Sequence, residues 1–155
     1  MEYRLLLVGL LFSLLACKKA PPPPVDVYTP PKVEDIVMYE LFPRSFSEDG
    51  TLDAVTERLD ELQDLGINCI WLMPIYPVGE AKRIPPLGSP YSVRDFKAIS
   101  PEYGDTSDFR ALVEAAHARG IAIILDIVAH HPAWDHPWIT QHPEMYTQDG
   151  NGNIV

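Results

Sequence analysis

The most constraining feature of the sequence is an apolar run that carries one carboxylate and ends in two histidines, Ile121–His131 (IAIILDIVAHH). It follows a segment with helical spacing, residues 109–119, which stops at a glycine. A helix, a glycine stop and then a strand apolar on both faces is typical of a βα repeat with a parallel sheet, in which helices cover both faces. Polar side chains at the carboxyl ends of such strands face the ligand crevice. Asp126, His130 and His131 are therefore the first candidates for function.

Two similar units precede this one. Residues 36–46 and 67–75 are rich in branched and aromatic side chains, and each is predicted to contain a strand. Between them, apolar residues recur at helical spacing, with Thr51 as the expected cap and Gly66 as the stop. A long loop, residues 76–104, is dense in proline and glycine and follows the second strand. The order predicts parallel strands joined by right-handed crossovers.

The fold class that this order predicts is α/β, and a (β/α)8 TIM barrel in particular. A complete barrel takes roughly 250 residues, and the chain has 155. We therefore expect only the first three βα units, over residues 33–155, together with the beginning of an insertion after the third strand.

The beginning of the chain has the pattern of an export signal. Arg4 precedes an apolar run, Leu5–Ala16, which is too short to span a bilayer as a helix. The segment Leu14–Cys17 (LLAC) resembles the lipobox of bacterial lipoproteins, which implies cleavage before Cys17 and lipidation of that cysteine. The predicted divisions are a signal peptide over 1–16 and a lipidated cysteine with a proline-rich linker over 17–32. An ordinary signal peptide with an incidental cysteine is the alternative.

Such an anchor would place the protein outside the cytoplasm, tethered to a membrane. Lys18 and Lys19 follow the cysteine and no aspartate does, which favours the outer membrane in lipoproteins of this kind. The net charge is −10, so the chain would repel nucleic-acid phosphates and is not expected to bind nucleic acid. With Cys17 lipidated, Cys69 has no disulfide partner and is expected to be a buried thiol.

Five ordered segments resemble the α-amylase family, glycoside hydrolase family 13. The segments are Tyr39–Phe46 (YELFPRSF), Asn68–Ile75 (NCIWLMPI), Gly88–Phe96 (GSPYSVRDF), Asp126–His131 (DIVAHH), and Trp134–Trp138 (WDHPW) with His142–Tyr146. The first, second and fourth are similar to the first three strands of the family's barrel, and the third to the loop after its second strand. The fifth resembles the opening of domain B.

The resemblance implies roles for four residues. Tyr91 would be the aromatic platform under the sugar at the cleavage point, and His131 would donate a hydrogen bond to a hydroxyl of that sugar. Asp126 would support the active site by holding an arginine from strand four, and Asp95 would support its own loop. A loop tyrosine that caps the barrel, a core histidine bonded to a carbonyl and a purely structural ion pair are the alternatives.

His130 departs from the family, which commonly has asparagine there as a calcium ligand. Imidazole is a poor ligand for calcium, so a calcium site is doubtful and no other cofactor is expected. Two other interpretations of the sequence involve a metal ion. His130, His131, His136 and Asp126 could hold zinc, although the spacing matches no familiar motif. Asp149, Asn151 and Asn153 resemble the start of an EF-hand loop, against which a polar turn is the alternative.

The function implied by the resemblance is that of an α-amylase-type retaining glycosidase acting on α-glucans or maltodextrins. Its two catalytic carboxylates come from strands four and five of the barrel, so none is expected among these residues and the chain by itself is expected to be inactive. The alternatives are a non-catalytic glycan-binding lipoprotein and a transglycosylase or isomerase of the same family.

Overall fold

The computed structural model describes residues 28–155. The predicted signal peptide, Cys17 and the run Pro21–Pro24 lie outside the described residues. Within residues 28–155, no helix is long and apolar enough to cross a membrane.

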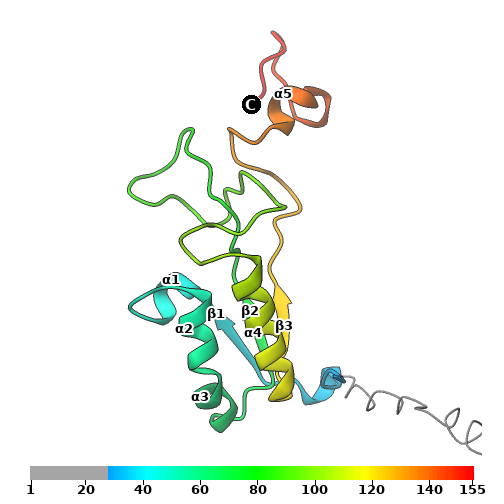
Figure 1. Cartoon of the computed structure of the whole chain (residues 1–155). Coiled ribbons are helices and arrows are strands. Elements are labelled where there is room, and N and C mark those ends of the chain that lie inside the picture. The colour runs from blue at the N-terminus through cyan, green and yellow to red at the C-terminus, as the bar shows by residue number, and fades with distance from the viewer. Residues whose placement is uncertain (1–27) are drawn as a thin grey trace, which may run out of the picture.

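The centre of the molecule is a three-stranded parallel sheet in the order β1-β2-β3, built from Met38–Leu41, Cys69–Leu72 and Ala122–Leu125. The strands pair in register, with Tyr39 opposite Ile70 and Ile70 opposite Ile123. All three run in the same direction, so their carboxyl ends meet at the upper edge of the sheet in Figure 1. Parallel βα organisation is therefore confirmed.

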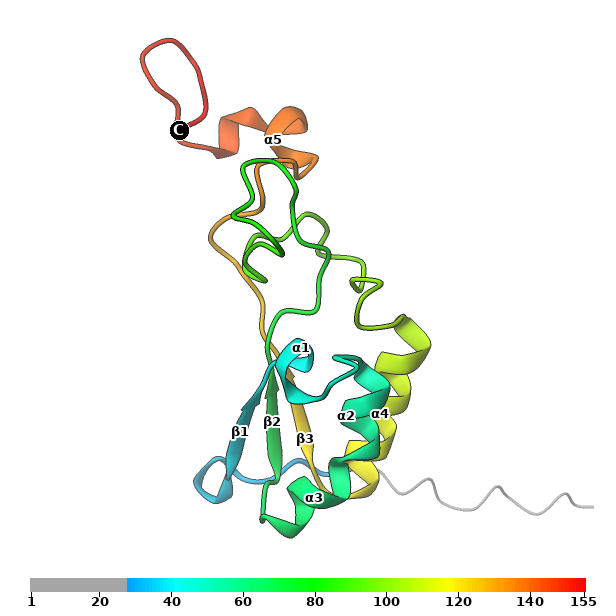
Figure 2. The same ribbon diagram turned by 90° about the vertical axis from the view of Figure 1, so that its left-hand side faces the viewer.

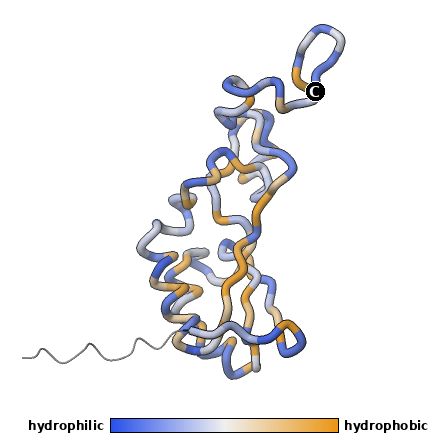
Figure 3. Tube along the Cα trace, turned by 90° about the vertical axis from the view of Figure 1, so that its right-hand side faces the viewer, coloured by the Kyte–Doolittle hydropathy of each residue, from blue (hydrophilic) through white to orange (hydrophobic). Residues whose placement is uncertain are grey.

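The helices cover one face of this sheet, as Figure 2 shows for α2 (Leu52–Glu57) and α4 (Thr106–Ala118). The core lies between these two layers, and the apolar strands stand out in Figure 3. Its fully buried members are Leu41, Leu52, Val55, Leu59, Leu62, Ile70, Leu72, Ile75, Tyr103, Leu112, Ala116 and Ile121. Burying one leucine of this set stabilises the fold by about 2 kcal/mol.

The prediction that helices cover both faces of the sheet is wrong for the described residues. On the face away from the helices, Trp71 and Ile124 lie side by side in register and are 37% and 43% exposed. In a TIM barrel the helices form an outer ring, and the inner face is filled by side chains from other strands. One-sided covering is thus what a segment of a barrel wall requires.

The predicted first helix is two helices. Arg58 separates α2 from α3 (Leu59–Asp64) with φ −105° and ψ 11°, outside helical geometry. The Arg58 guanidinium lies 4.4 Å from the centre of the Phe46 ring, and its Nη1 donates to the Phe46 carbonyl at 2.7 Å. The apolar spacing continues across the break, which is why the sequence pattern did not reveal it.

The other predicted boundaries differ by a few residues. A short helix, α1 (Pro43–Phe46), follows β1, where a loop was predicted. Helix α4 begins at Thr106, before the predicted start at Phe109, because Asp105 accepts hydrogen bonds from its first turn and Asp108 bonds back to the Asp105 amide. Gly66 and Gly120 end their helices in left-handed geometry, with φ +80° and +74°, as expected.

Two long segments extend beyond the carboxyl end of the sheet. They are the loop after β2 and the segment after β3, which contains α5 (Trp138–Gln141) and a turn of 3-10 helix, Pro143–Met145. Another 3-10 turn, Val33–Asp35, precedes β1 at the opposite end. Cys69 is a buried free thiol, as predicted.

Replacing Thr51 tests the predicted helix cap. Thr51 Oγ1 accepts a hydrogen bond from the Ala54 amide at 3.2 Å. We expect Thr51→Ala to lower the free energy of unfolding by about 1 kcal/mol, because the amide loses its acceptor at a helix start. Thr51→Ser is the matched control and should unfold in urea like the unchanged chain. Equal stability of the alanine and serine variants would contradict the assignment.

Candidate functional site

Asp126 lies at the carboxyl end of β3, where the loop after β2 comes over the sheet. The Asp126 amide extends the strand pairing by donating to the Leu72 carbonyl at 2.9 Å. The Tyr91 hydroxyl donates to Asp126 Oδ2 at 3.3 Å. Burial raises the pKa of Tyr91, and the negative charge of Asp126 and the hydrogen bond raise it further, so the phenol stays protonated and donates. The structure thus brings two of the predicted site residues together.

A buried tyrosine that the sequence reasoning missed lies in the same region. Tyr76 directly follows the second predicted strand, and only 7% of it is exposed. Burial raises its pKa, and Asp126 adds to that shift through its charge. The Tyr76 ring packs edge-on against Phe96 at 5.8 Å between centres. Tyr76 therefore packs the beginning of the loop after β2 against a later part of the same loop.

His130 and His131 are both exposed, and they contact each other. Their Nδ1 atoms are 3.3 Å apart and their rings are nearly perpendicular, so one nitrogen donates and the other accepts. Both line a cavity of about 390 Å³. The other residues of that cavity are Phe96, Ile127, Val128, Ala129, Pro132, Trp138, Met145 and Tyr146. Tyr91 is not among them, so Tyr91 and His131 belong to neighbouring parts of the same end of the sheet.

Asp95 acts on its own loop. Its Oδ1 atom accepts a hydrogen bond from the Lys97 amide at 2.8 Å, which closes a turn two residues long. This turn fixes the loop next to Asp95, which also lines a cavity described below.

The two segments beyond the sheet are joined by backbone pairing. Val78 and Val93 form an antiparallel bridge within the loop after β2. The Ala133 amide, in the segment after β3, donates to the Val93 carbonyl at 2.7 Å. Tyr91 lies just before this crossing, so the pairing fixes the backbone that carries it.

Asp135 also connects the segment after β3 to the loop after β2. The sequence analysis assigned it no role. Its Oδ2 atom accepts a hydrogen bond from the Glu80 amide at 2.8 Å. Burial raises the pKa of Asp135, but hydrogen bonds from backbone amides and the charge of Arg94 outweigh that effect, and the net pKa is lowered. Gly79 leaves the room for this contact, because a Cβ there would lie 2.4 Å from Asp135 Oδ1 and 2.3 Å from Ala133 Cβ. Gly79 was therefore the feature of the sequence that could have indicated this contact.

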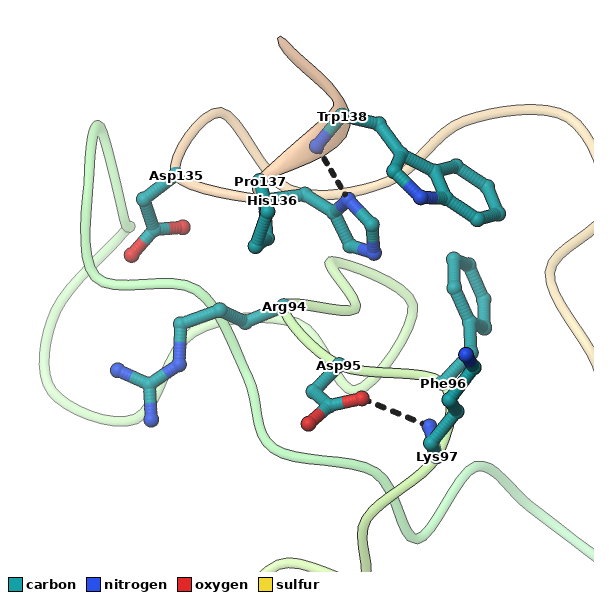
Figure 4. A pocket seen from close by; sticks show the side chains of 8 residues that line it. All are labelled: Arg94, Asp95, Phe96, Lys97, Asp135, His136, Pro137 and Trp138. Atoms are coloured by element: carbon teal, nitrogen blue, oxygen red, sulfur yellow. Dashed lines mark hydrogen bonds between the residues drawn. The ribbon is translucent and has the colours of Figure 1, made fainter. Parts of the chain in front are cut away.

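A second cavity, of about 360 Å³, lies between the two segments and is drawn in Figure 4. It is lined by Arg94, Asp95, Phe96, Lys97, Asp135, His136, Pro137 and Trp138. The buried His136 ring accepts a hydrogen bond from the Trp138 amide at its Nδ1 atom, at 3.1 Å. Burial lowers the pKa of His136, although Asp95 and Asp135 act in the opposite direction. His136 is thus a neutral ring whose remaining proton is on Nε2.

The metal alternatives gain no support from the geometry. Across residues 28–155, no three histidine, cysteine or acidic side chains gather in a way that could hold a metal ion. The suggested zinc cluster of His130, His131, His136 and Asp126 is therefore not assembled. Asp149 accepts hydrogen bonds from the Asn151 and Asn153 amides at 2.9 Å, as in a polar turn.

Comparison with known proteins gives one consistent family. Residues 40–151 match the family model described as alpha amylase, catalytic domain. The chain is 46% identical over 110 residues to trehalose synthase/amylase TreS of Mycobacterium tuberculosis, covering 68% of this chain and 17% of that protein. It is 41% identical over 134 residues to alpha-1,4-glucan:maltose-1-phosphate maltosyltransferase of Cereibacter sphaeroides, covering 75% of this chain and 20% of that protein.

Solved structures agree with these relatives. An alpha-amylase from Lactobacillus plantarum superposes with a TM-score of 0.75 at 41% identity, covering 78% of this chain and 29% of that one. Trehalose-6-phosphate hydrolase from Bacillus licheniformis superposes with a TM-score of 0.63 at 28% identity, covering 77% of this chain and 23% of that one. The chain thus spans about a fifth of the length of these curated relatives and a quarter or so of the solved chains.

Adding a methyl group at Gly79 tests the contact between the two segments. We expect Gly79→Ala to lower the free energy of unfolding by about 1–3 kcal/mol, because the new Cβ would overlap Asp135 and Ala133. Gly150→Ala is the matched control, since a Cβ there meets nothing within 4 Å and should change stability by less than about 0.5 kcal/mol. Urea unfolding measures both, and equal stability of the two variants would show that the contact is absent.

Proposed function

The chain belongs to the alpha-amylase family, and from this we propose that it is part of a retaining glycosidase that acts on α-glucans or maltodextrins. The observation that carries the proposal is the hydrogen bond from Tyr91 to Asp126 at the carboxyl end of β3. Ligands of α/β barrels bind at that end, and both residues match family motifs.

In this proposal Tyr91 forms the platform for a glucosyl unit. The face of an aromatic ring packs against the apolar face of a pyranose, and its negative quadrupole favours the positive charge that develops at the transition state. Asp126 accepts a hydrogen bond from the phenol at 3.3 Å and so holds the ring in place. His131, exposed in the neighbouring cavity, supplies a hydrogen bond to a sugar hydroxyl.

The chemical step needs two further carboxylates. A retaining enzyme uses a nucleophile and an acid/base group about 5 Å apart on either side of the scissile bond. We place neither in residues 28–155: Asp126 is engaged with Tyr91, and no family motif in this chain corresponds to the catalytic pair. The chain by itself is then a sugar-binding unit without turnover.

A second candidate is transglycosylation or isomerisation by the same site. It is favoured by the names of two relatives, a trehalose synthase and a maltosyltransferase. Chromatography of the products formed from maltooligosaccharides by an enzyme containing this segment would separate the reactions. A glycan-binding protein without catalysis uses the same residues and would give no product.

Export and lipid anchoring through Cys17 belong to the same proposal. They are supported by the LLAC segment and by the proline-rich stretch that follows it. An anchored glycosidase would meet polymeric substrate outside the cell, where α-glucans occur as long chains.

Substitutions at Tyr91 test the platform. We expect Tyr91→Ala to weaken maltotriose binding to the chain about tenfold in calorimetry, because the stacking surface is removed. Tyr91→Phe keeps the ring and should bind within a few fold of the unchanged chain. Tyr28→Ala is the matched control at the far end of the sheet, where Tyr28 stacks on His117 at 3.8 Å. Unchanged binding by Tyr91→Ala, or glucose release by the chain alone, would contradict the proposal.

Calcium dependence is tested by a chelator. Because His130 replaces an oxygen ligand with imidazole, we expect EDTA to leave the melting temperature of the chain unchanged. Scanning calorimetry with EDTA, and then with excess calcium, measures this. A melting temperature that falls with EDTA and recovers with calcium would show that the substitution does not remove the site.

A further inference from the structure

The two cavities beyond the sheet share a wall. Phe96 and Trp138 line both the cavity that holds His131 and the cavity that holds Asp95. In Figure 4 the rings of Phe96 and Trp138 lie on one side of the Asp95 cavity, and Asp135 and Arg94 lie on the opposite side. The two cavities therefore meet at these two rings.

Trp138 has the environment of a rigid platform. It is 44% exposed, yet its ring is backed by Phe96 at 6.0 Å between ring centres and by His136 at 4.7 Å. The Trp138 amide is also fixed by its hydrogen bond to His136. An indole that packs against two rings loses little conformational entropy when a ligand contacts its exposed part.

The polar groups around Trp138 favour a neutral ligand. Arg94 and Lys97 offset Asp95 and Asp135 within the cavity, and Arg94 is also paired with Glu80 at 3.5 Å. A net charge of −10 on the chain further disfavours a phosphate or carboxylate ligand. The carboxylate of Asp95 accepts hydrogen bonds, while the Lys97 ammonium and the His136 Nε2 donate them. Hydroxyl groups can satisfy donors and acceptors together.

We propose that Trp138, with Asp95, Lys97 and His136, forms an accessory subsite for a glucosyl unit of an α-glucan chain. The subsite adjoins the His131 cavity through Phe96 and Trp138, and the inference rests on the function proposed above. At about 360 Å³, its cavity falls in the size range of small-ligand sites. Its effect is selectivity for chain length, because a long chain contacts both cavities and a disaccharide contacts one.

The test compares maltose with maltoheptaose on the 155-residue chain by calorimetry. We expect the unchanged chain to bind maltoheptaose at least tenfold more tightly than maltose. Trp138→Ala should reduce that ratio to about threefold or less, because the platform is lost. Lys97→Ala, which changes a residue of the Asp95 cavity only, should also lower the ratio and should leave the affinity for maltose within a factor of two. Trp138→Phe retains a ring and should restore most of the ratio.

A matched control is Trp134→Ala, since Trp134 is 40% exposed on the same segment and faces Lys82 instead of the cavity. It should keep the full ratio. A Trp138→Ala variant that melts like the unchanged chain and keeps the ratio would overturn the inference. Equal binding of maltose and maltoheptaose by the unchanged chain would also overturn it, while leaving the Tyr91 proposal standing. Loss of maltose binding in Tyr91→Ala but not in Lys97→Ala separates the two sites.

Discussion

The parallel, in-register pairing of three strands determines where everything else in this molecule lies. Because Leu41, Leu72 and Leu125 are partners in the same row, the three strands end at the same level. The segments that follow β2 and β3 must therefore leave the sheet from one edge. Residues far apart in the sequence, such as Tyr91 and Asp126, meet there, although α4 and β3 lie between them in the chain. The location of the site therefore depends first on the direction of the strands and only then on particular side chains.

The loop after β2 and the segment after β3 hold each other in place through mutual contacts. The backbone bond from Ala133 to Val93 and the carboxylate bond from Asp135 to the Glu80 amide connect two segments that have almost no regular structure. Buried backbone groups need partners, and these bonds supply them where a sheet or helix would otherwise do so. The pairing fixes the backbone next to Tyr91, and Asp135 also lines the second cavity. One set of contacts thus serves both proposed binding regions.

Local patterns predicted what depends on neighbours in the chain. The three strands, the Thr51 cap and the glycine stops follow from spacing and turn chemistry, and the structure confirms them. The start of α4 was missed because the apolar spacing begins at Phe109, although the Asp105–Asp108 capping box was visible in the sequence. Asp135 and Trp138 acquire their surroundings from residues about forty positions earlier or more, and no local periodicity encodes such a meeting. Family motifs located Tyr91 and Asp126, but only the structure pairs them.

The exposed face of the sheet bears on how the rest of a barrel would be built. Glu40, Trp71 and Ile124 form one row across the three strands, on the face that the helices leave open. Trp71 and Ile124 are each exposed by more than a third, which is unfavourable in water. Burial of their apolar surface would stabilise the fold by about 25 cal/mol per Å². In a TIM barrel this face points inward and is filled by side chains from the other strands. Closure therefore explains why this row is open and why the helices of residues 28–155 lie on the other face. On this argument a carboxylate in the row, that of Glu40, would be enclosed near the axis, below the end of the sheet at which Tyr91 and Asp126 meet.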